Sequence, residues 1–242
     1  MKGDYDYYSS MVTAFSDVDK LLFVSGNDVT NRLKQHENVV RAAIKAGVKH
    51  IVYTSLLTNV PVEKTVIAAV TETHLKTEKL LKNSGVSYNI LRNNLYMDLL
   101  VQSIGEHVLE TGTIFYPSAE GKTAFVLRSE MAEAAAEILV TDEHDGKIYN
   151  ITNIESYTFQ EVAAALTSIT GKKINFVSPG IESFKSTLGS AGLPSQLVDD
   201  ITAFAHAQSL NEFNVVGDDL KNLLGRNPMN LHTYLSMIYG GK

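Results

Sequence analysis

Three short stretches of the chain are almost continuously hydrophobic, and each has the length of a β-strand. They run from Leu21 to Ser25, from Val48 to Ser55 and from Val86 to Leu91, and they are rich in branched or aromatic residues. Strands that are covered on both faces have this unbroken apolar pattern, whereas strands with one face in water alternate between apolar and polar residues. The three stretches therefore predict strands of a parallel sheet.

A helix-length segment lies in each gap between these stretches. The first runs from Asn31 to Ala46 and is followed by Gly47, and the second runs from Val66 to Asn83. In the second segment most apolar residues recur at the three- to four-residue spacing that places them on one stripe of a helix. Because strands and helices alternate, we expect right-handed βαβ units.

The pattern changes after about Tyr96, where helical segments outnumber short strands. Residues 97–242 are therefore predicted to form a smaller, mainly helical lobe with elements that return to the sheet, and residues 1–96 to form the sheet domain. The expected helices are 97–110, 129–140, 159–170, 181–190, 195–208 and 230–239, and the expected short strands are 113–116, 124–128 and 174–177. The best-defined helix is 159–170, because Thr158 and Glu161 form a capping-box pattern and Gly171 provides a stop.

Composition narrows the class of protein. With 242 residues, of which 44% are hydrophobic, the chain can bury the core of one large domain or of a domain plus a lobe. Its formal net charge of -6 and its dispersed Lys and Arg residues argue against a nucleic acid or an anionic membrane as partner. The start lacks the pattern of a signal peptide, and no apolar run is long enough to cross a bilayer, so we expect a cytoplasmic protein.

Two kinds of site are not expected from the composition. The chain has no cysteine, which excludes disulfides, thiolate nucleophiles and zinc–thiolate centres. Its seven histidines are scattered over separate segments without the spacing of metal ligands. We therefore predict no metal site.

Several short phrases occur in an order that resembles one family. The phrases are Gly3-Asp4-Tyr5, His36-Glu37-Asn38-Val39-Val40, Ala46-Gly47-Val48-Lys49-His50-Ile51-Val52-Tyr53-Thr54-Ser55, Thr77-Glu78-Lys79-Leu80-Leu81 and Ile90-Leu91-Arg92-Asn93-Asn94-Leu95-Tyr96. Together they resemble the NmrA-like branch of the atypical short-chain dehydrogenase/reductases, and most of all its bacterial NAD(P)H:quinone oxidoreductases of type 2. The likeness spans most of the chain.

The resemblance implies a Rossmann-like parallel sheet that binds NADP or NAD, with NADPH favoured, at the carboxyl ends of its strands. Residues 1–96 would then be the remaining part of the NAD(P)-binding domain. The implied activity of the full-length parent is hydride transfer from NAD(P)H to a quinone-like small molecule. The alternative is a non-catalytic, NAD(P)-sensing regulatory protein. The choice between NAD and NADP, the true substrate and the oligomeric state stay open, and a homo-oligomer is one of the possibilities.

Five residues after or near strand ends are candidates for cofactor binding. By resemblance, Asp4 would lie beside the adenine, Ser25 and Gly26 would approach a ribose or the diphosphate, and Thr54 and Ser55 would approach the nicotinamide ribose or the substrate carbonyl. Each has a structural alternative: Asp4 as a turn or helix cap, Gly26 as a glycine turn, and the hydroxyls as strand-end caps.

Reductases of the wider superfamily use a Tyr-x-x-x-Lys motif, in which the lysine lowers the pKa of the tyrosine. By alignment on Glu78 and Lys79, the tyrosine position is Val70 and the lysine position is His74, so the usual proton donor is absent. We predict that His74 contacts ribose or a quinone oxygen, with Glu78 one helical turn later to orient its ring. A surface pair on a polar helix face is the alternative.

The residues after the third strand complete the candidate site. By resemblance, Asn93 would bind cofactor, and Tyr96 would act with His74 at the reacting end. Otherwise Arg92 is structural and Tyr96 belongs to the core.

One departure from the family pattern is at the front of the chain. Nothing before Gly3 matches the strand, the glycine-rich loop and the helix that hold the pyrophosphate in such proteins. We expect a fragment or a truncated gene model that lacks roughly 40 to 60 residues. The strand from Leu21 to Ser25 would then lie at the edge of the sheet, and cofactor binding by these residues alone is doubtful.

Overall fold

The structure is a computed structural model that describes residues 1–241. It divides into two compact units, which we call the sheet unit and the helical unit. The sheet unit comprises Met1–Leu57, Ala68–Asn93 and Met131–Ile151, and the helical unit comprises Thr58–Ile67, Asn94–Glu130 and the chain from Thr152 onward.

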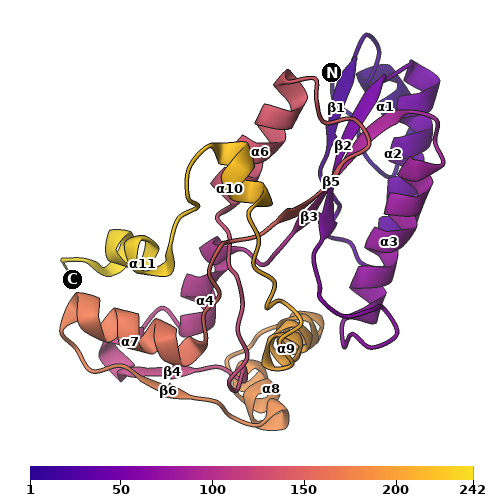
Figure 1. Ribbon diagram of the computed structural model, residues 1–242. Helices are drawn as coiled ribbons and strands as arrows, with labels where there is room; N and C mark the ends of the chain where they lie inside the picture. Colours follow the sequence, from indigo (N-terminus) through magenta and orange to yellow (C-terminus); the bar gives the residue numbers. More distant parts are fainter. Residues whose placement is uncertain (242) are drawn as a thin grey trace. The chain divides into compact units, whose positions relative to one another are not determined.

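A four-stranded parallel sheet forms the centre of the sheet unit (Figure 1). Its strands are β1 (Lys20–Phe23), β2 (His50–Leu56), β3 (Ser87–Asn93) and β5 (Ile148–Ile151), in the order β1-β2-β3-β5. All three pairings are parallel, so the predicted Rossmann-like parallel sheet is confirmed. Within residues 1–241, β1 lies at one edge of the sheet.

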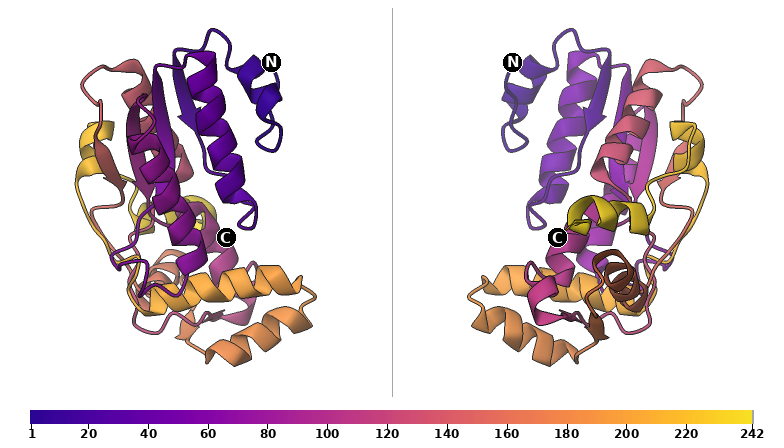
Figure 2. Two further views of the ribbon diagram at one scale, coloured as in Figure 1. Left: turned by 90° about the vertical axis from the view of Figure 1, so that its right-hand side faces the viewer. Right: turned by 90° about the vertical axis from the view of Figure 1, so that its left-hand side faces the viewer.

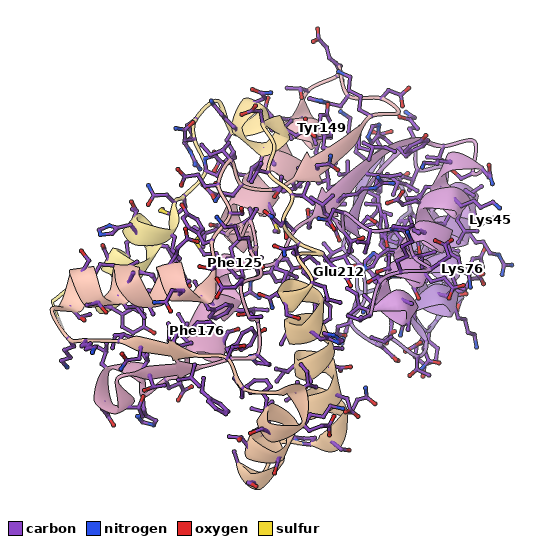
Figure 3. The ribbon with its side chains drawn as sticks, turned by 60° about the horizontal axis from the view of Figure 1, so that its bottom comes forward. Lys45, Lys76, Phe125, Tyr149, Phe176 and Glu212 are labelled. Atoms are coloured by element: carbon purple, nitrogen blue, oxygen red, sulfur yellow. The ribbon has the colours of Figure 1, made fainter. Side chains whose placement is uncertain are left out.

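Helices cover both faces of this sheet. Figures 1 and 2 show α1 (Tyr8–Ala14), α2 (Arg32–Ala46) and α3 (Ala68–Lys82) on one face and α6 (Arg128–Val140) on the other. On the first face the core contains Phe23, Ile51 and Tyr53 from the strands, which are each at most 1% exposed. The charged ends of α2 and α3 side chains such as Lys45 and Lys76 point away from the sheet (Figure 3).

Three predicted strands and two predicted helices of the sheet unit form with boundaries shifted by one or two residues. The strand β5 was not predicted as an element. It has only four residues, and Asn150 interrupts them, so it lacks the unbroken apolar run of a central strand. Its place beside β3 depends on pairing between Ile90 and Ile148, which are far apart in the sequence.

The helical unit is built around an aromatic core. Phe159 at the start of α7 is 2% exposed and stacks on Tyr116 and Phe176 with ring centroids 4.4 and 6.0 Å apart. The unit's elements, besides the start of α6, are a 3-10 helix (Met97–Leu99), α4 (Leu100–Ile104), α5 (Val108–Thr111), β4 (Thr113–Phe115), α7 (Phe159–Thr170), β6 (Asn175–Val177), α8 (Ile181–Ser190), α9 (Ser195–Ser209), α10 (Asp219–Leu224) and α11 (Leu231–Tyr239). Strands β4 and β6 pair in parallel as a separate small sheet.

The capping-box prediction at α7 is confirmed. Thr158 Oγ1 accepts the backbone N–H of Glu161 at 3.1 Å, and the Glu161 carboxylate accepts the backbone N–H of Thr158 at 2.7 Å. Gly171 ends the helix with a φ of 70°. The two side chains thus satisfy backbone donors that the first turn leaves without helical partners.

Two other predictions in this unit are wrong. The expected helix 97–110 is interrupted because Gly105 has a φ of 88°, outside the helical region. The expected strand 124–128 is not a strand, since Ala124 N–H donates to Phe213 and Val126 N–H to Leu95, so no continuous ladder forms with one partner. Helix α10 was not predicted, and its six residues are too few to establish an apolar stripe.

Candidate functional site

The carboxyl ends of the sheet strands bring several predicted residues together. Parallel strands end at the same edge of a sheet, so Ser25 after β1, Thr54 and Ser55 in β2, and Asn93 in β3 meet there. The Ser25 backbone N–H donates to Thr54 Oγ1 at 2.9 Å. Leu56 is the register partner of Asn93, and the Leu57 N–H donates to the Asn93 carbonyl at 2.9 Å. This edge is the candidate site.

Strand alternation assigns these side chains to two faces. Thr54 pairs in register with Leu91, and Ser55 with Arg92. Because successive side chains point to opposite faces of a sheet, Thr54 and Asn93 share one face, and Ser55 and Arg92 share the face of α2 and α3. Ligand contacts at this edge would therefore come from both faces.

Asn93 carries the clearest mark of a binding residue. Its side chain is 6% exposed, and Oδ1 is buried without a hydrogen-bond partner among residues 1–241. A buried carbonyl oxygen without a donor costs about 1–3 kcal/mol, and native proteins rarely tolerate one without a reason. A ligand that brings an N–H or O–H to the end of β3 would satisfy this oxygen.

Glu78 joins helix α3 to the ends of β2 and β3. Its carboxylate is 2% exposed and accepts hydrogen bonds from Arg92 Nε at 2.9 Å, Arg92 Nη2 at 2.7 Å and Ser55 Oγ at 2.8 Å. Burial by itself would raise the pKa of Glu78, but the hydrogen bonds from Arg92 and Ser55, with the charges of Arg92 and Lys82, outweigh it and lower that pKa. The carboxylate is therefore ionised.

The expected pairing of Glu78 with His74 does not form. His74 is 6% exposed, and its Nδ1 lies 2.8 Å from the hydroxyl of Tyr53. The two side chains leave α3 toward different strand positions, so the imidazole meets Tyr53 in the core and the carboxylate meets Ser55. The alternative of a surface His–Glu pair is also wrong, because both side chains are buried.

Burial also decides the charge of His74. Removal from water, with a smaller contribution from the charge of Arg32, lowers the pKa of His74 to about 3. The ring is therefore neutral at neutral pH and has no imidazolium proton to give. Any role of His74 in the reaction is restricted to that of a neutral hydrogen-bonding ring.

His36 holds the loop that follows β1. The Gly26 N–H donates to His36 Nε2 at 3.1 Å, and His36 Nδ1 lies 2.8 Å from Thr77 Oγ1. Because a backbone N–H can only donate, Nε2 is the acceptor and Nδ1 carries the proton that goes to Thr77. Thr77 in turn donates to the Thr73 carbonyl at 2.9 Å, so each group in this series of hydrogen bonds has a partner.

Gly26 and Asp4 have local structural partners in addition to their predicted roles. A Cβ at Gly26 would meet Gln35 Oε1 at 3.0 Å, so the close approach that glycine permits here is to a side chain of α2. Asp4 Oδ1 accepts the Asp6 N–H at 2.9 Å in a turn before α1. The Asp4 contact matches the turn-or-cap alternative, and neither contact excludes ligand binding.

Tyr96 belongs to the helical unit. It is 36% exposed, and the Arg128 guanidinium lies over its ring at 5.7 Å from the centroid. The Arg128 N–H donates to Asp98 at 2.8 Å, which places the start of α6 beside this ring. Tyr96 is thus a half-exposed residue in contact with a cation, and the alternative that assigns it to the core is wrong.

No group of three His, Cys, Asp or Glu residues that could hold a metal ion occurs in the described part of the chain. Among residues 1–241, each helix is too short or too polar to cross a lipid bilayer.

The sequence did not identify the partners of Glu78, nor Arg92 as the residue that joins it to β3. The available signal was the position of Arg92 directly before the predicted Asn93 at a strand end. An arginine directly after the apolar pair Ile90-Leu91 needs an acid within reach, and the nearest helix offered Glu72 and Glu78. The choice between them required the register.

Comparison with known proteins identifies relatives along nearly the whole chain. A profile of the NmrA-like family matches residues 1–235. Quinone oxidoreductase 2 of Escherichia coli (strain K12) is 35% identical over 198 residues, which cover 82% of this chain and 68% of that protein.

Two solved structures resemble this fold closely. The NADPH-dependent quinone oxidoreductase QOR2 of Escherichia coli, complexed with NADPH, matches with a TM-score of 0.91 and 31% identity over 99% of this chain and 83% of that one. The triphenylmethane reductase of Citrobacter sp., complexed with NADP(H), matches with a TM-score of 0.89 and 35% identity over 97% of this chain and 81% of that one.

Proposed function

This chain belongs to the NmrA-like family, and from that premise we propose that it is an NAD(P)H-dependent oxidoreductase that transfers a hydride to a quinone-like small molecule. The relatives described above support the proposal because they are named as a quinone oxidoreductase and a triphenylmethane reductase, and two of their structures hold NADPH or NADP(H). The same names favour the enzyme over a regulatory protein that only senses the cofactor. NADPH is accordingly the cofactor that we propose.

The observation that carries the proposal is the unpartnered Oδ1 of Asn93. A nicotinamide cofactor has a carboxamide N–H₂ and ribose hydroxyls, which are the donors that this buried oxygen lacks. Thr54 supports the same placement, because its oxygen already accepts the Ser25 N–H and its hydroxyl proton is left for a ligand oxygen. The residues at this edge therefore fit the nicotinamide half of the cofactor.

The bound cofactor would supply the hydride, and the residues of this chain would bind and orient. Val70 stands at the position of the usual tyrosine, so no phenol is available there as a proton donor. A quinone is electrophilic enough to accept a hydride with little acid catalysis, and the one proton that then completes the hydroquinone comes from water. Proximity and orientation are then the main contributions of the protein.

The remaining assignments are part of the proposal. Asp4, Ser25, Gly26 and Ser55 are proposed to contact the cofactor, and Tyr96 the reacting end. His74 is proposed to act as a neutral ring that positions Tyr53, its hydrogen-bond partner in the same strand as Ser55. Its buried position supports this role, and its low pKa argues against a role as an acid.

The test compares NADPH oxidation in the presence of a benzoquinone with NADPH binding measured by calorimetry. Asn93→Leu removes the unpartnered oxygen, so we expect unchanged or higher stability and NADPH binding weakened by about tenfold. The matched control is Asn89→Leu on the same strand. Asn89 is fully buried and bonded to His50 and Lys147, so its replacement should lower stability and leave NADPH binding unchanged.

Two results would contradict the proposal. One is the absence of quinone-dependent NADPH oxidation by the unmodified chain although NADPH binds. The other is an Asn93→Leu variant that loses as much stability as Asn89→Leu while its NADPH binding is unaltered.

A further inference from the structure

The hydroxyl of Ser55 has a defined donor direction. Within residues 1–241, the side chain of Ser55 has one hydrogen-bond partner, the Glu78 carboxylate at 2.8 Å, and that carboxylate also accepts two hydrogen bonds from Arg92. An ionised carboxylate has no proton and can only accept. The Ser55 O–H must therefore be the donor, which leaves the lone pairs of Ser55 Oγ as the only hydrogen-bonding capacity that it can offer to a ligand.

The position of Glu78 makes this direction stable. Its side chain is 2% exposed, the two Arg92 bonds use both carboxylate oxygens, and Lys82 Nζ lies 3.6 Å away. Reversal of the Ser55 hydroxyl would leave a buried charged oxygen with one donor fewer, and such a loss costs more than that of a neutral hydrogen bond. Ser55 is thus held as an acceptor.

Thr54, the residue before Ser55, has the opposite character. Its Oγ1 accepts the Ser25 N–H at 2.9 Å, so its own O–H is the group left to donate. The end of β2 consequently presents a donor on one face and an acceptor on the other. Two adjacent hydroxyls that sequence alone treats as equivalent are distinguished by their partners.

We propose that Glu78 is a positioning residue that acts through Ser55, and that Ser55 Oγ accepts a hydrogen bond from a ribose hydroxyl or carboxamide N–H of the nicotinamide cofactor. This inference rests on the proposed function. It assigns Ser55 to the cofactor and excludes Ser55 as the group that polarises the carbonyl of the quinone, because a carbonyl oxygen needs a donor.

The test is a double-mutant cycle on NADPH binding, measured by calorimetry, with KM for NADPH and kcat as second readouts. Ser55→Ala removes the acceptor and leaves the Glu78–Arg92 pair intact. We expect binding of NADPH weakened about three- to tenfold, as for one lost hydrogen bond, with kcat little changed. Glu78→Gln should weaken NADPH binding similarly, because a Gln amide can donate to Ser55 and turn its hydroxyl outward.

The double variant decides between a role through Ser55 and a general structural role. In the Ser55→Ala background, Glu78→Gln should cause no further loss of NADPH affinity, whereas independent effects would multiply. If Glu78→Gln is too unstable to assay, Glu78→Asp replaces it, since the shorter carboxylate keeps its charge but does not reach Ser55.

The matched control is Glu130→Gln in the helical unit. Glu130 is 3% exposed and pairs with Arg226 at 2.7 Å, so it is also a buried carboxylate held by an arginine. Its replacement should lower the free energy of unfolding as Glu78→Gln does, without a change in NADPH binding.

The outcomes separate this inference from the proposed function. Additive effects, or a Ser55→Ala variant that binds NADPH as the unmodified chain does, overturn the inference while quinone reduction stands. Coupled effects on binding without any quinone reduction overturn the function and uphold the inference. Absence of NADPH binding by the unmodified chain overturns both.

Discussion

Mild acid should destabilise the sheet unit because two of its histidines are buried in the neutral form. In the unfolded chain a histidine has a pKa of about 6.5. Burial away from water, the largest cause, lowers the pKa of His36 to about 4 and that of His74 to about 3 in the folded protein. Both folded values lie below the unfolded value. The stability is therefore complete above pH 6.5 and is lost as the pH falls from there toward the folded pKa values.

The size of the loss follows from the unfolded pKa. Near pH 5, protonation of one histidine in the unfolded chain favours unfolding by about 2 kcal/mol, and two such residues by about 4 kcal/mol. This is a large fraction of the roughly 5–15 kcal/mol by which domains are stable. The folded protein should therefore show a clear shift of its unfolding midpoint between near-neutral and mildly acidic buffers.

Urea unfolding near pH 7 and near pH 5 tests this reasoning. His74→Gln keeps a polar side chain for Tyr53 but cannot titrate. Its free energy of unfolding should therefore fall between pH 7 and pH 5 by about 2 kcal/mol less than that of the unmodified protein. Carboxylates contribute equally to both proteins and cancel in the difference. His232→Gln, at an exposed position of α11, is the control and should retain the full loss. An equal loss in His74→Gln and the unmodified protein would refute a buried, neutral His74.

Three further predictions concern stability and are measured by urea unfolding at neutral pH. Phe159→Ala should cost about 3–5 kcal/mol because this ring is 2% exposed in the core of the helical unit, and a small effect would show that the core collapses into the space. Thr158→Ala should cost about 1 kcal/mol through loss of the α7 capping box, and no loss would mean that water replaces the cap. Gly121→Ala should cost about 1–3 kcal/mol, since its Cβ would lie 1.9 Å from a backbone oxygen. Gly189→Ala within α8 has open space and should gain about 0.5–1 kcal/mol. A Gly121→Ala variant more stable than Gly189→Ala would contradict this packing.

Local patterns predicted the elements with strong periodicity and missed those without it. The strands β1 to β3 and the helices α2, α3 and α7 form where apolar runs, stripes and caps indicated. Strand β5 has too few apolar residues to produce such a signal, and it exists because β3 offers a free edge. The expected strand 124–128 shows the converse, since an apolar run without a neighbouring strand edge does not become a strand.

The candidate site was predictable to the same extent. Ser25, Thr54, Ser55 and Asn93 could be placed at one edge because parallel strands end together, which is a consequence of chain order alone. Whether these residues contact cofactor stays a prediction. Their hydrogen-bonding character could not be read from the sequence, because it depends on which neighbours use each donor and acceptor.

Ser55 and Glu78 show which features follow from the sequence and which require the tertiary structure. The sequence by itself determined that Ser55 ends a buried strand and that Glu78 and His74 lie one turn apart on a helix, since both statements depend on local spacing. Only the tertiary structure decided that Glu78 meets Ser55 and Arg92, which are 23 and 14 positions away, while His74 meets Tyr53. The physical reason is that strand register and the seating of α3 on the sheet bring these atoms within hydrogen-bond distance, and neither is encoded in any short segment.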